Sequence, residues 1–207
     1  MTLKSVLRFS WAYDLSQTLF GVPHARKWFV QEMLRPLPTD HVFEVGCGTG
    51  VLLDMMPPIA SYFGYDISET YIRTARLRYP QYRFEAAAAE DLLRGPPIPS
   101  DIVFCLGVLH HLDEAQFKAL MRLAAMNMKP GARFIALEPC YLKHHAPLSR
   151  WFISRDRGGY VRSVSEYVSL LKEEFEVVES EVVSGLLNLP YMHLAIECKL
   201  PKLKPQA

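Results

Sequence analysis

The sequence predicts an α/β fold of three layers, in which helices cover both faces of a central, mostly parallel β-sheet. Short apolar segments typical of buried strands alternate along the chain with segments whose apolar residues recur at helical spacing. The connections are long enough for right-handed crossovers between parallel strands. Ligands of such folds bind beyond the carboxyl ends of the strands, so glycines and acids at strand ends are the first candidates for a site.

Composition limits the function classes. The chain has 207 residues, of which 50% are apolar and 22% charged, enough for one domain with a packed core. Its net charge of +1 argues against binding nucleic acid through a charged surface. The four cysteines are far apart and form no C-x-x-C pair, which predicts free thiols in a reducing cytoplasm. The first residues lack the pattern of a secretory signal, and the longest apolar run, 102–109, is too short for stable membrane insertion.

The first predicted strand runs into a glycine-rich turn within residues 41–50. Glycines permit a tight turn and let a ligand lie directly on the backbone. A helix expected to begin near Val51 would direct its free N–H groups at that ligand. A dinucleotide site is one alternative, but its G-x-G-x-x-G spacing requires a glycine at Val51. The pattern E-x-G-x-G-x-G that begins at Glu44 instead resembles motif I of the class I S-adenosylmethionine-dependent methyltransferases.

Two later segments are similar to the same family. The D-I-V-x-x-x-x-V-L-H-H-L pattern that begins at Asp101 resembles its fourth-strand region, and the K-P-G-x-x-x-x-x-x-E-P pattern that begins at Lys129 resembles the region of its fifth strand. Asp66 lies about twenty residues beyond the first glycine, where a carboxylate can accept two hydrogen bonds from a ribose. The resemblance implies a Rossmann-like sheet of seven strands whose last strand is antiparallel to its neighbours.

The resemblance also implies S-adenosylmethionine as the cofactor. The expected cofactor-binding residues are Tyr13, Glu44, Gly46, Cys47, Gly48, Gly50, Asp66, Ile67, Ala89, Glu90 and Leu106. Ala89 and Glu90 have two alternative interpretations, a contact with the adenine or an ordinary loop. In the family the paired histidines lie near the transferred methyl group, and histidine titrates near neutrality, so His110 and His111 are the candidate catalytic residues.

We expect residues 1–38 to form an N-terminal helical cap, 39–200 the methyltransferase domain and 201–207 a tail. Within the domain, residues 140–163 interrupt the regular alternation where the family places substrate-recognition elements. This segment mixes aromatic residues with arginines, as a pocket for a ring or an anion would, and a solvated loop with aromatic anchors is the alternative. The candidate substrate-binding residues are Tyr141, Trp151, Arg157 and Arg162. No metal site is predicted, because no carboxylate or cysteine stands at ligand spacing from the histidines of this segment.

These features predict transfer of a methyl group to a small-molecule acceptor by in-line displacement at the sulfonium methyl, with oxygen or carbon as the accepting atom. Two alternatives remain open. A non-catalytic S-adenosylmethionine-binding regulatory protein would keep every cofactor motif, and an NAD-dependent oxidoreductase would share the sheet. A cytoplasmic location is expected, without a nucleic-acid partner.

Overall fold

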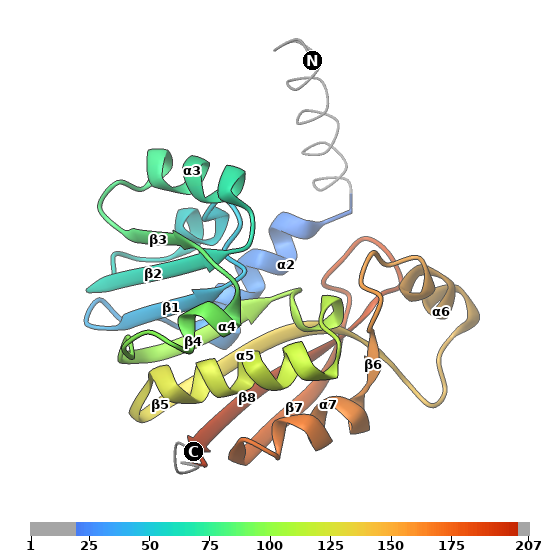
Figure 1. Cartoon of the computed structure of the whole chain (residues 1–207). Coiled ribbons are helices and arrows are strands. Elements are labelled where there is room, and N and C mark those ends of the chain that lie inside the picture. The colour runs from blue at the N-terminus through green and yellow to red at the C-terminus, as the bar shows by residue number, and fades with distance from the viewer. Residues whose placement is uncertain (1–19, 203–207) are drawn as a thin grey trace.

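The central sheet is the frame of the molecule. The computed structural model describes residues 20–202 of the chain (Figure 1). The strands lie in the order β3-β2-β1-β4-β5-β8-β7, with the short β6 paired to β5 off this path. Their bounds are β1 His41–Val45, β2 Ser61–Asp66, β3 Arg83–Ala86, β4 Ser100–Leu106, β5 Met128–Tyr141, β6 Arg162–Ser163, β7 Phe175–Ser184 and β8 Met192–Pro201.

The strands β1 to β6 pair in parallel, whereas β8 runs antiparallel to both of its neighbours, β5 and β7. The prediction of a mostly parallel sheet with an antiparallel last strand is therefore confirmed. The parallel strands end at one edge of the sheet, and β8 begins at that same edge, because His193 pairs with Pro139 near the end of β5. Side chains from the start of β8 thus join those from the ends of β1, β4 and β5.

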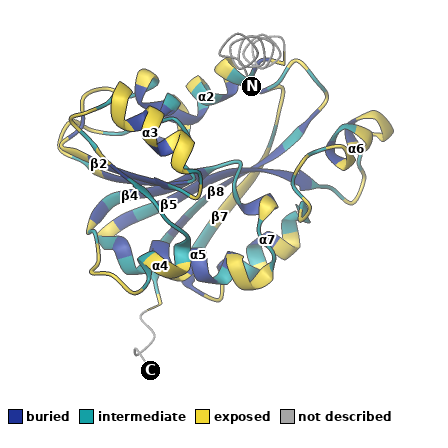
Figure 2. Ribbon diagram, turned by 45° about the horizontal axis from the view of Figure 1, so that its top comes forward, coloured by how far each residue is buried: buried dark blue, intermediate teal, exposed yellow. Residues whose placement is uncertain are grey.

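Helices cover both faces of this sheet (Figure 2). One face carries α2 (Val22–Trp28), a π-helix (Phe29–Leu34), a 3₁₀ helix (Val51–Met55) and α3 (Glu69–Arg78). The other carries α4 (Ala89–Leu92), α5 (Glu114–Asn127) and α7 (Val164–Leu171), while α6 (Pro147–Ser154) lies beyond the end of β5. A 3₁₀ turn, Leu109–His111, connects β4 to α5.

Each face buries its own apolar cluster, which explains why β1 is apolar without alternation. Phe43 and Val45 pack with α5 and α7, and Val42 packs with α2 and α3. The helix starts follow the predicted caps. The Ser68 side chain accepts from the backbone of α3, and Asp113 forms a capping box with Gln116 at the start of α5.

Three local predictions need correction. The helix expected from Val51 is only a 3₁₀ helix of five residues, because Pro57 and Pro58 follow directly. Strand β5 extends from Met128 to Tyr141, so the expected insert begins inside the sheet. The rest of the insert contains a helix, α6, which a proline in its first turn starts and a buried Ile153 anchors. Tyr13 lies outside the described residues.

Candidate functional site

The glycine-rich turn after β1 folds back against β2. Gly46 and Cys47 both donate their N–H groups to the Tyr65 carbonyl, at 2.8 and 3.0 Å. Gly46 and Gly48 have positive φ angles of 69° and 54°. A Cβ atom on Gly46 would lie 2.6 Å from Cγ2 of Val108, whereas a Cβ on Gly48 would meet nothing within 4 Å. The turn therefore packs closely at its start and leaves bare backbone facing open space at its centre.

Asp66, at the end of β2, is fixed in place by the backbone. Its Oδ2 accepts from the N–H of Gly48 at 3.0 Å and its Oδ1 from the N–H of Ser68 at 2.8 Å. A carboxylate oxygen has two lone pairs, so each oxygen keeps capacity for one further donor. The side chain can bridge two hydroxyl groups of a ligand while it holds two loops together.

A cavity of about 770 Å³ lies beyond the ends of β1, β2 and β4, and we call it the first cavity. Pockets for small ligands usually measure about 300–1,000 Å³. Eight of the residues predicted from the sequence line it: Gly46, Gly48, Asp66, Ile67, Ala89, Glu90, Leu106 and His111. Tyr65 also lines it, and its buried hydroxyl has no hydrogen-bond partner among the described residues.

Three of the predicted cofactor residues lie behind the turn instead of lining this cavity. Glu44 is buried and accepts a hydrogen bond from the hydroxyl of Tyr62. Burial raises the pKa of Glu44 to about 8. Cys47 is buried, and Gly50 faces the rings of Tyr79 and Phe84. Glu44, Cys47 and Gly50 thus support the shape of the turn from the rear.

A second cavity of about 360 Å³ adjoins the first, and the two share Leu106 and Gly107 at the end of β4. Apolar side chains make most of its wall, from α2, from the ends of β4 and β5, and from the segment that precedes β8. They are Phe20, Val22, Ala25, Leu106, Leu137, Pro139, Leu187 and Leu189. Arg26, His110, Asp156, Tyr191 and His193 provide its polar groups.

His110 is held by two carboxylates. Its Nδ1 lies 2.7 Å from Oε2 of Glu138 and its Nε2 lies 3.2 Å from Oδ1 of Asp156. Burial alone would lower the pKa of His110, but the hydrogen bonds to Asp156 and Glu138 raise it to about 9. At neutral pH His110 is therefore an imidazolium that donates from both nitrogens. The pKa of His111 is lowered by burial and by the adjacent charge of His110.

Glu138 organises the turn that follows β4. It is fully buried, and its Oε1 accepts from the N–H groups of Val108 and Leu109 at 2.8 and 2.9 Å. Glu138, the acid of the E-P pattern, thus shapes the turn that carries both histidines. Because one carboxylate binds the backbone and the His110 ring together, the position of the ring depends on Glu138.

Sequence reasoning missed three polar residues of the second cavity, Asp156, Tyr191 and His193. The hydroxyl of Tyr191 donates to Oδ2 of Asp156 at 2.5 Å. The Nδ1 atom of His193 is buried without a hydrogen-bond partner among the described residues, and burial lowers the pKa of this ring to about 4. The alternation Tyr191-x-His193 at the start of the antiparallel strand is the signal that could have found two of them, because that strand begins where the parallel strands end.

None of the four predicted substrate-binding residues lines either cavity. Tyr141 lies at the end of β5 with the Arg150 guanidinium 5.8 Å from its ring centre, and Trp151 is half-exposed on α6. Arg157 is exposed. Arg162 donates to the carbonyls of Leu109 and Leu112, at 3.1 and 2.8 Å, and so braces the histidine turn from outside.

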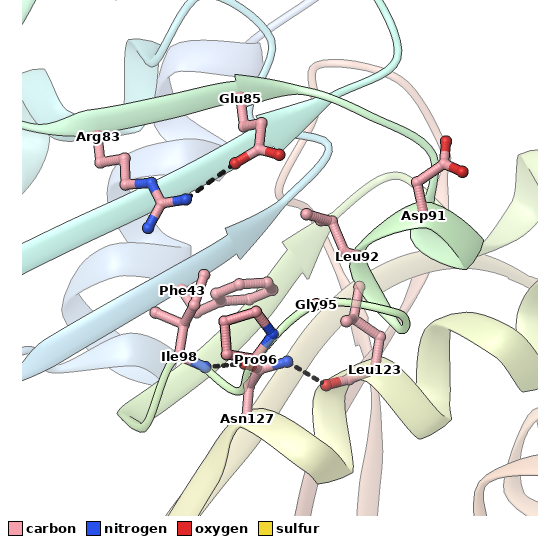
Figure 3. A pocket seen from close by; sticks show the side chains of 10 residues that line it. All are labelled: Phe43, Arg83, Glu85, Asp91, Leu92, Gly95, Pro96, Ile98, Leu123 and Asn127. Carbon is pink, nitrogen blue, oxygen red and sulfur yellow. Dashed lines mark hydrogen bonds and ion pairs between the residues drawn. The ribbon is translucent and has the colours of Figure 1, made fainter.

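A third cavity, of about 120 Å³, lies between β3, α4 and α5 (Figure 3). Its polar side chains are already paired within the protein. Arg83 and Glu85 form an ion pair at 3.1 Å, and Asn127 accepts from the N–H of Ile98 and donates to the carbonyl of Leu123. The first and second cavities, which hold convergent groups with remaining hydrogen-bonding capacity, are therefore the better candidates for the functional site.

Two features are absent from residues 20–202. No group of three or more histidine, cysteine, aspartate or glutamate side chains in this part of the chain is arranged to hold a metal ion. In the same range, no helix has the length and apolar character needed to cross a membrane.

Comparison with known proteins agrees with this geometry. Residues 43–134 match the model of a family described as a methyltransferase domain. The ubiquinone biosynthesis O-methyltransferase of Thiobacillus denitrificans is 32% identical over 101 residues, which cover 46% of this chain and 43% of that protein. The same enzyme from Idiomarina loihiensis is 31% identical over 120 residues, 56% of this chain and 49% of that protein. The chain thus spans about half the length of the curated relatives it matches.

Solved structures show the same fold. An S-adenosylmethionine-dependent methyltransferase from Clostridium acetobutylicum has a TM-score of 0.70 and 13% identity, with 96% of this chain and all of that chain covered. The mitomycin 7-O-methyltransferase MmcR has a TM-score of 0.62 and 17% identity, with 86% of this chain and 53% of that chain covered.

Proposed function

We propose that this chain, whose residues 43–134 match the model of a methyltransferase domain, binds S-adenosylmethionine and transfers a methyl group from that cofactor to an oxygen atom of a small molecule. One observation carries the proposal. A cavity of nucleoside size, built on bare backbone and an anchored carboxylate, opens beside a second and mainly apolar cavity at Leu106 and Gly107.

The residues of the first cavity fit the cofactor. The open space over Gly48 admits a ligand against the backbone, and Asp66 has acceptor capacity for the two ribose hydroxyls. The unpaired hydroxyl of Tyr65 offers a further hydrogen bond to a polar ligand. Ala89 and Glu90 follow β3 and line the same cavity, which supports an adenine contact at these residues. We propose that Glu44, Cys47 and Gly50 contribute to cofactor binding indirectly, because they support the turn.

When bound, S-adenosylmethionine supplies a methyl group on a positively charged sulfur, and this group is already electrophilic. The chain's own residues have to hold the acceptor in line and exclude water. Leu106 and Gly107 contribute the wall common to both cavities, which supports their position at the reacting centre. His110, charged at neutral pH, acts as a hydrogen-bond donor that fixes Asp156, and His111 lines the first cavity.

The second cavity best suits an acceptor that is small and mainly apolar. The second cavity measures about 360 Å³ and most of its wall is aliphatic or aromatic. The relatives are ubiquinone biosynthesis O-methyltransferases, which supports oxygen as the accepting atom. The near-neutral net charge supports a small molecule over nucleic acid.

The residues that line the second cavity support the proposed division of the chain. Helix α2 lines the second cavity, which supports a covering role for residues 1–38. Asp156 supports a substrate-side role for residues 140–163, although the predicted contacts Tyr141, Trp151, Arg157 and Arg162 would then act by positioning that segment. The four cysteines are all buried free thiols, which supports a reducing compartment such as the cytoplasm.

Calorimetry and a transfer assay test this function. We expect S-adenosylhomocysteine to bind with a stoichiometry of one and NADH to give no heat. Incubation with methyl-labelled S-adenosylmethionine and a metabolite extract should then label a small molecule. Binding of NADH instead would favour the oxidoreductase, and cofactor binding without any labelled product would favour a non-catalytic regulator.

A further inference from the structure

The second cavity contains a polar atom without a partner. In residues 20–202, three buried side-chain atoms lack a hydrogen bond, namely the hydroxyls of Tyr65 and Tyr167 and the Nδ1 atom of His193. Tyr167 lies in the apolar cluster under α5 and α7, and Tyr65 lines the first cavity. His193 lines the second cavity and is 9% exposed. An unpaired buried polar group costs about 1–3 kcal/mol, a cost that a ligand removes when it supplies the missing partner.

We propose that His193 binds the hydroxyl group of the methyl acceptor through Nδ1 and takes its proton during transfer, so that the acceptor is a phenol or another hydroxyl compound. This inference rests on the proposed function, because it assigns the accepting group within the second cavity. His193 is then a catalytic residue from the last strand of the sheet, far in sequence from the motif region.

The paired histidines of the motif are less suited to this task. Both ring nitrogens of His110 already bind carboxylates, at 2.7 and 3.2 Å, so the ring has no lone pair to offer. His111 lines the first cavity. His193, by contrast, lines the second cavity, and its Nδ1 is buried without a hydrogen-bond partner among the described residues.

Burial keeps the ring of His193 neutral in the absence of a ligand. Glu138 on β5 and Asp156 in the segment before β6 favour the protonated ring, while His110 opposes it. Tyr191 packs against the ring at 5.1 Å between centroids, and Arg26 faces the same cavity from α2. Burial outweighs the two carboxylates, so the pKa of His193 is about 4 and the ring is a hydrogen-bond acceptor at neutral pH.

A weakly basic imidazole is sufficient for this step. As the acceptor oxygen forms its bond to the methyl carbon, the carbon–sulfur bond breaks and its electron pair remains on sulfur. The oxygen of a neutral hydroxyl would become a positively charged oxonium, which is a far stronger acid than an imidazolium. The proton therefore passes to Nδ1 of His193 late in the step, and it leaves to water when the methylated product departs.

The same geometry disfavours other acceptors. A carboxylate acceptor has no proton to give to Nδ1 of His193. A carbon acceptor would leave Nδ1 of His193 unpaired. A hydroxyl satisfies the atom and adds no charge, and a phenol also suits the apolar wall.

Nitrogen NMR of the intact chain tests the proposal directly. The protein, labelled with ¹⁵N-histidine and saturated with S-adenosylhomocysteine, is titrated with phenol, catechol and 4-nitrophenol, and with anisole as the matched ring without a hydroxyl. His193→Asn assigns the signal. We expect at least one phenol to shift the Nδ1 resonance of His193 and anisole to leave it unchanged. The proposal is overturned when no phenol moves this resonance, or when anisole moves it equally.

Transfer rates to the labelled product provide the second readout. We expect His193→Leu to lower the rate at least 100-fold while the affinity for S-adenosylhomocysteine stays within twofold. His41→Asn, at an exposed position where β1 begins and outside both cavities, is the control and should keep the wild-type rate. A His193→Leu protein of wild-type rate would refute the role of His193 alone. Failure of the wild-type chain to bind S-adenosylhomocysteine would refute the proposed function instead.

Discussion

Gly158 provides a sharp test of how the histidine turn is held. A Cβ atom added at this position would lie 1.9 Å from Cδ2 of His110 and 2.6 Å from the His110 carbonyl oxygen. Rotation of the ring cannot relieve the second contact, because the carbonyl belongs to the backbone. Gly158→Ala should therefore push the segment after α6 away from His110.

The cost follows from the contacts that this movement breaks. Overpacking costs about 1–3 kcal/mol. The Tyr160 N–H donates to the His110 carbonyl at 2.9 Å, and each such hydrogen bond contributes about 1 kcal/mol. We expect Gly158→Ala to lower the free energy of unfolding by about 3 kcal/mol. In a chain of this length that corresponds to a melting temperature about 6–12 °C lower.

Gly159→Ala is a matched control from the neighbouring position. A Cβ there would meet nothing within 4 Å. We expect the stability of this variant to remain within about 0.5 kcal/mol of wild type in urea denaturation. Equal stability of the two alanine variants would refute the packing of this segment on His110, and so would greater damage from Gly159→Ala.

Three further predictions concern the site. Asp66→Asn should weaken S-adenosylhomocysteine binding about 10- to 100-fold in calorimetry, since the amide keeps only one acceptor oxygen; an unchanged affinity would remove Asp66 from the cofactor site. Gly46→Ala places its Cβ against Val108 and should weaken S-adenosylhomocysteine binding by a similar factor. Adding Val108→Ala to this variant should restore part of the lost affinity. Absence of any restoration would contradict the clash. The pKa of His110 is raised from 6.5 to about 9, so its stabilising effect is complete below pH 6.5 and is lost as pH rises through 9. The free energy of unfolding should fall by about 3 kcal/mol over this window in the wild type and by clearly less in Asp156→Asn. Equal falls in the two proteins would contradict the pairing of His110 with Asp156.

Eight residues that line the first cavity were predictable because their positions are set locally. Each of these eight lies within a few positions of a strand end, as Gly48 follows β1 and Asp66 ends β2. The periodic apolar segments predicted the sheet for the same reason, and the caps at Ser68 and Asp113 marked the helix starts.

The arginine-rich segment shows where composition misleads. Arg162 combines charge with neighbouring aromatic residues, as an anion site would, yet its guanidinium binds the carbonyls of Leu109 and Leu112. Helix and turn carbonyls without internal partners need donors, and a guanidinium supplies several at once. Sequence alone does not distinguish an arginine that binds the protein's own backbone from one that binds a ligand.

The polar residues of the second cavity were not predicted, because two of them lie where an antiparallel strand begins. A parallel strand brings its last residues to the functional edge, so attention falls on residues that follow apolar runs. Strand β8 runs in the opposite direction, so the residues near its start reach this edge. They include Tyr191 and His193. Asp156 joins them from a segment 35 residues before Tyr191, through a single hydrogen bond. In a sheet with one antiparallel strand, the residues that precede an apolar run are therefore as strong candidates for the site as those that follow one.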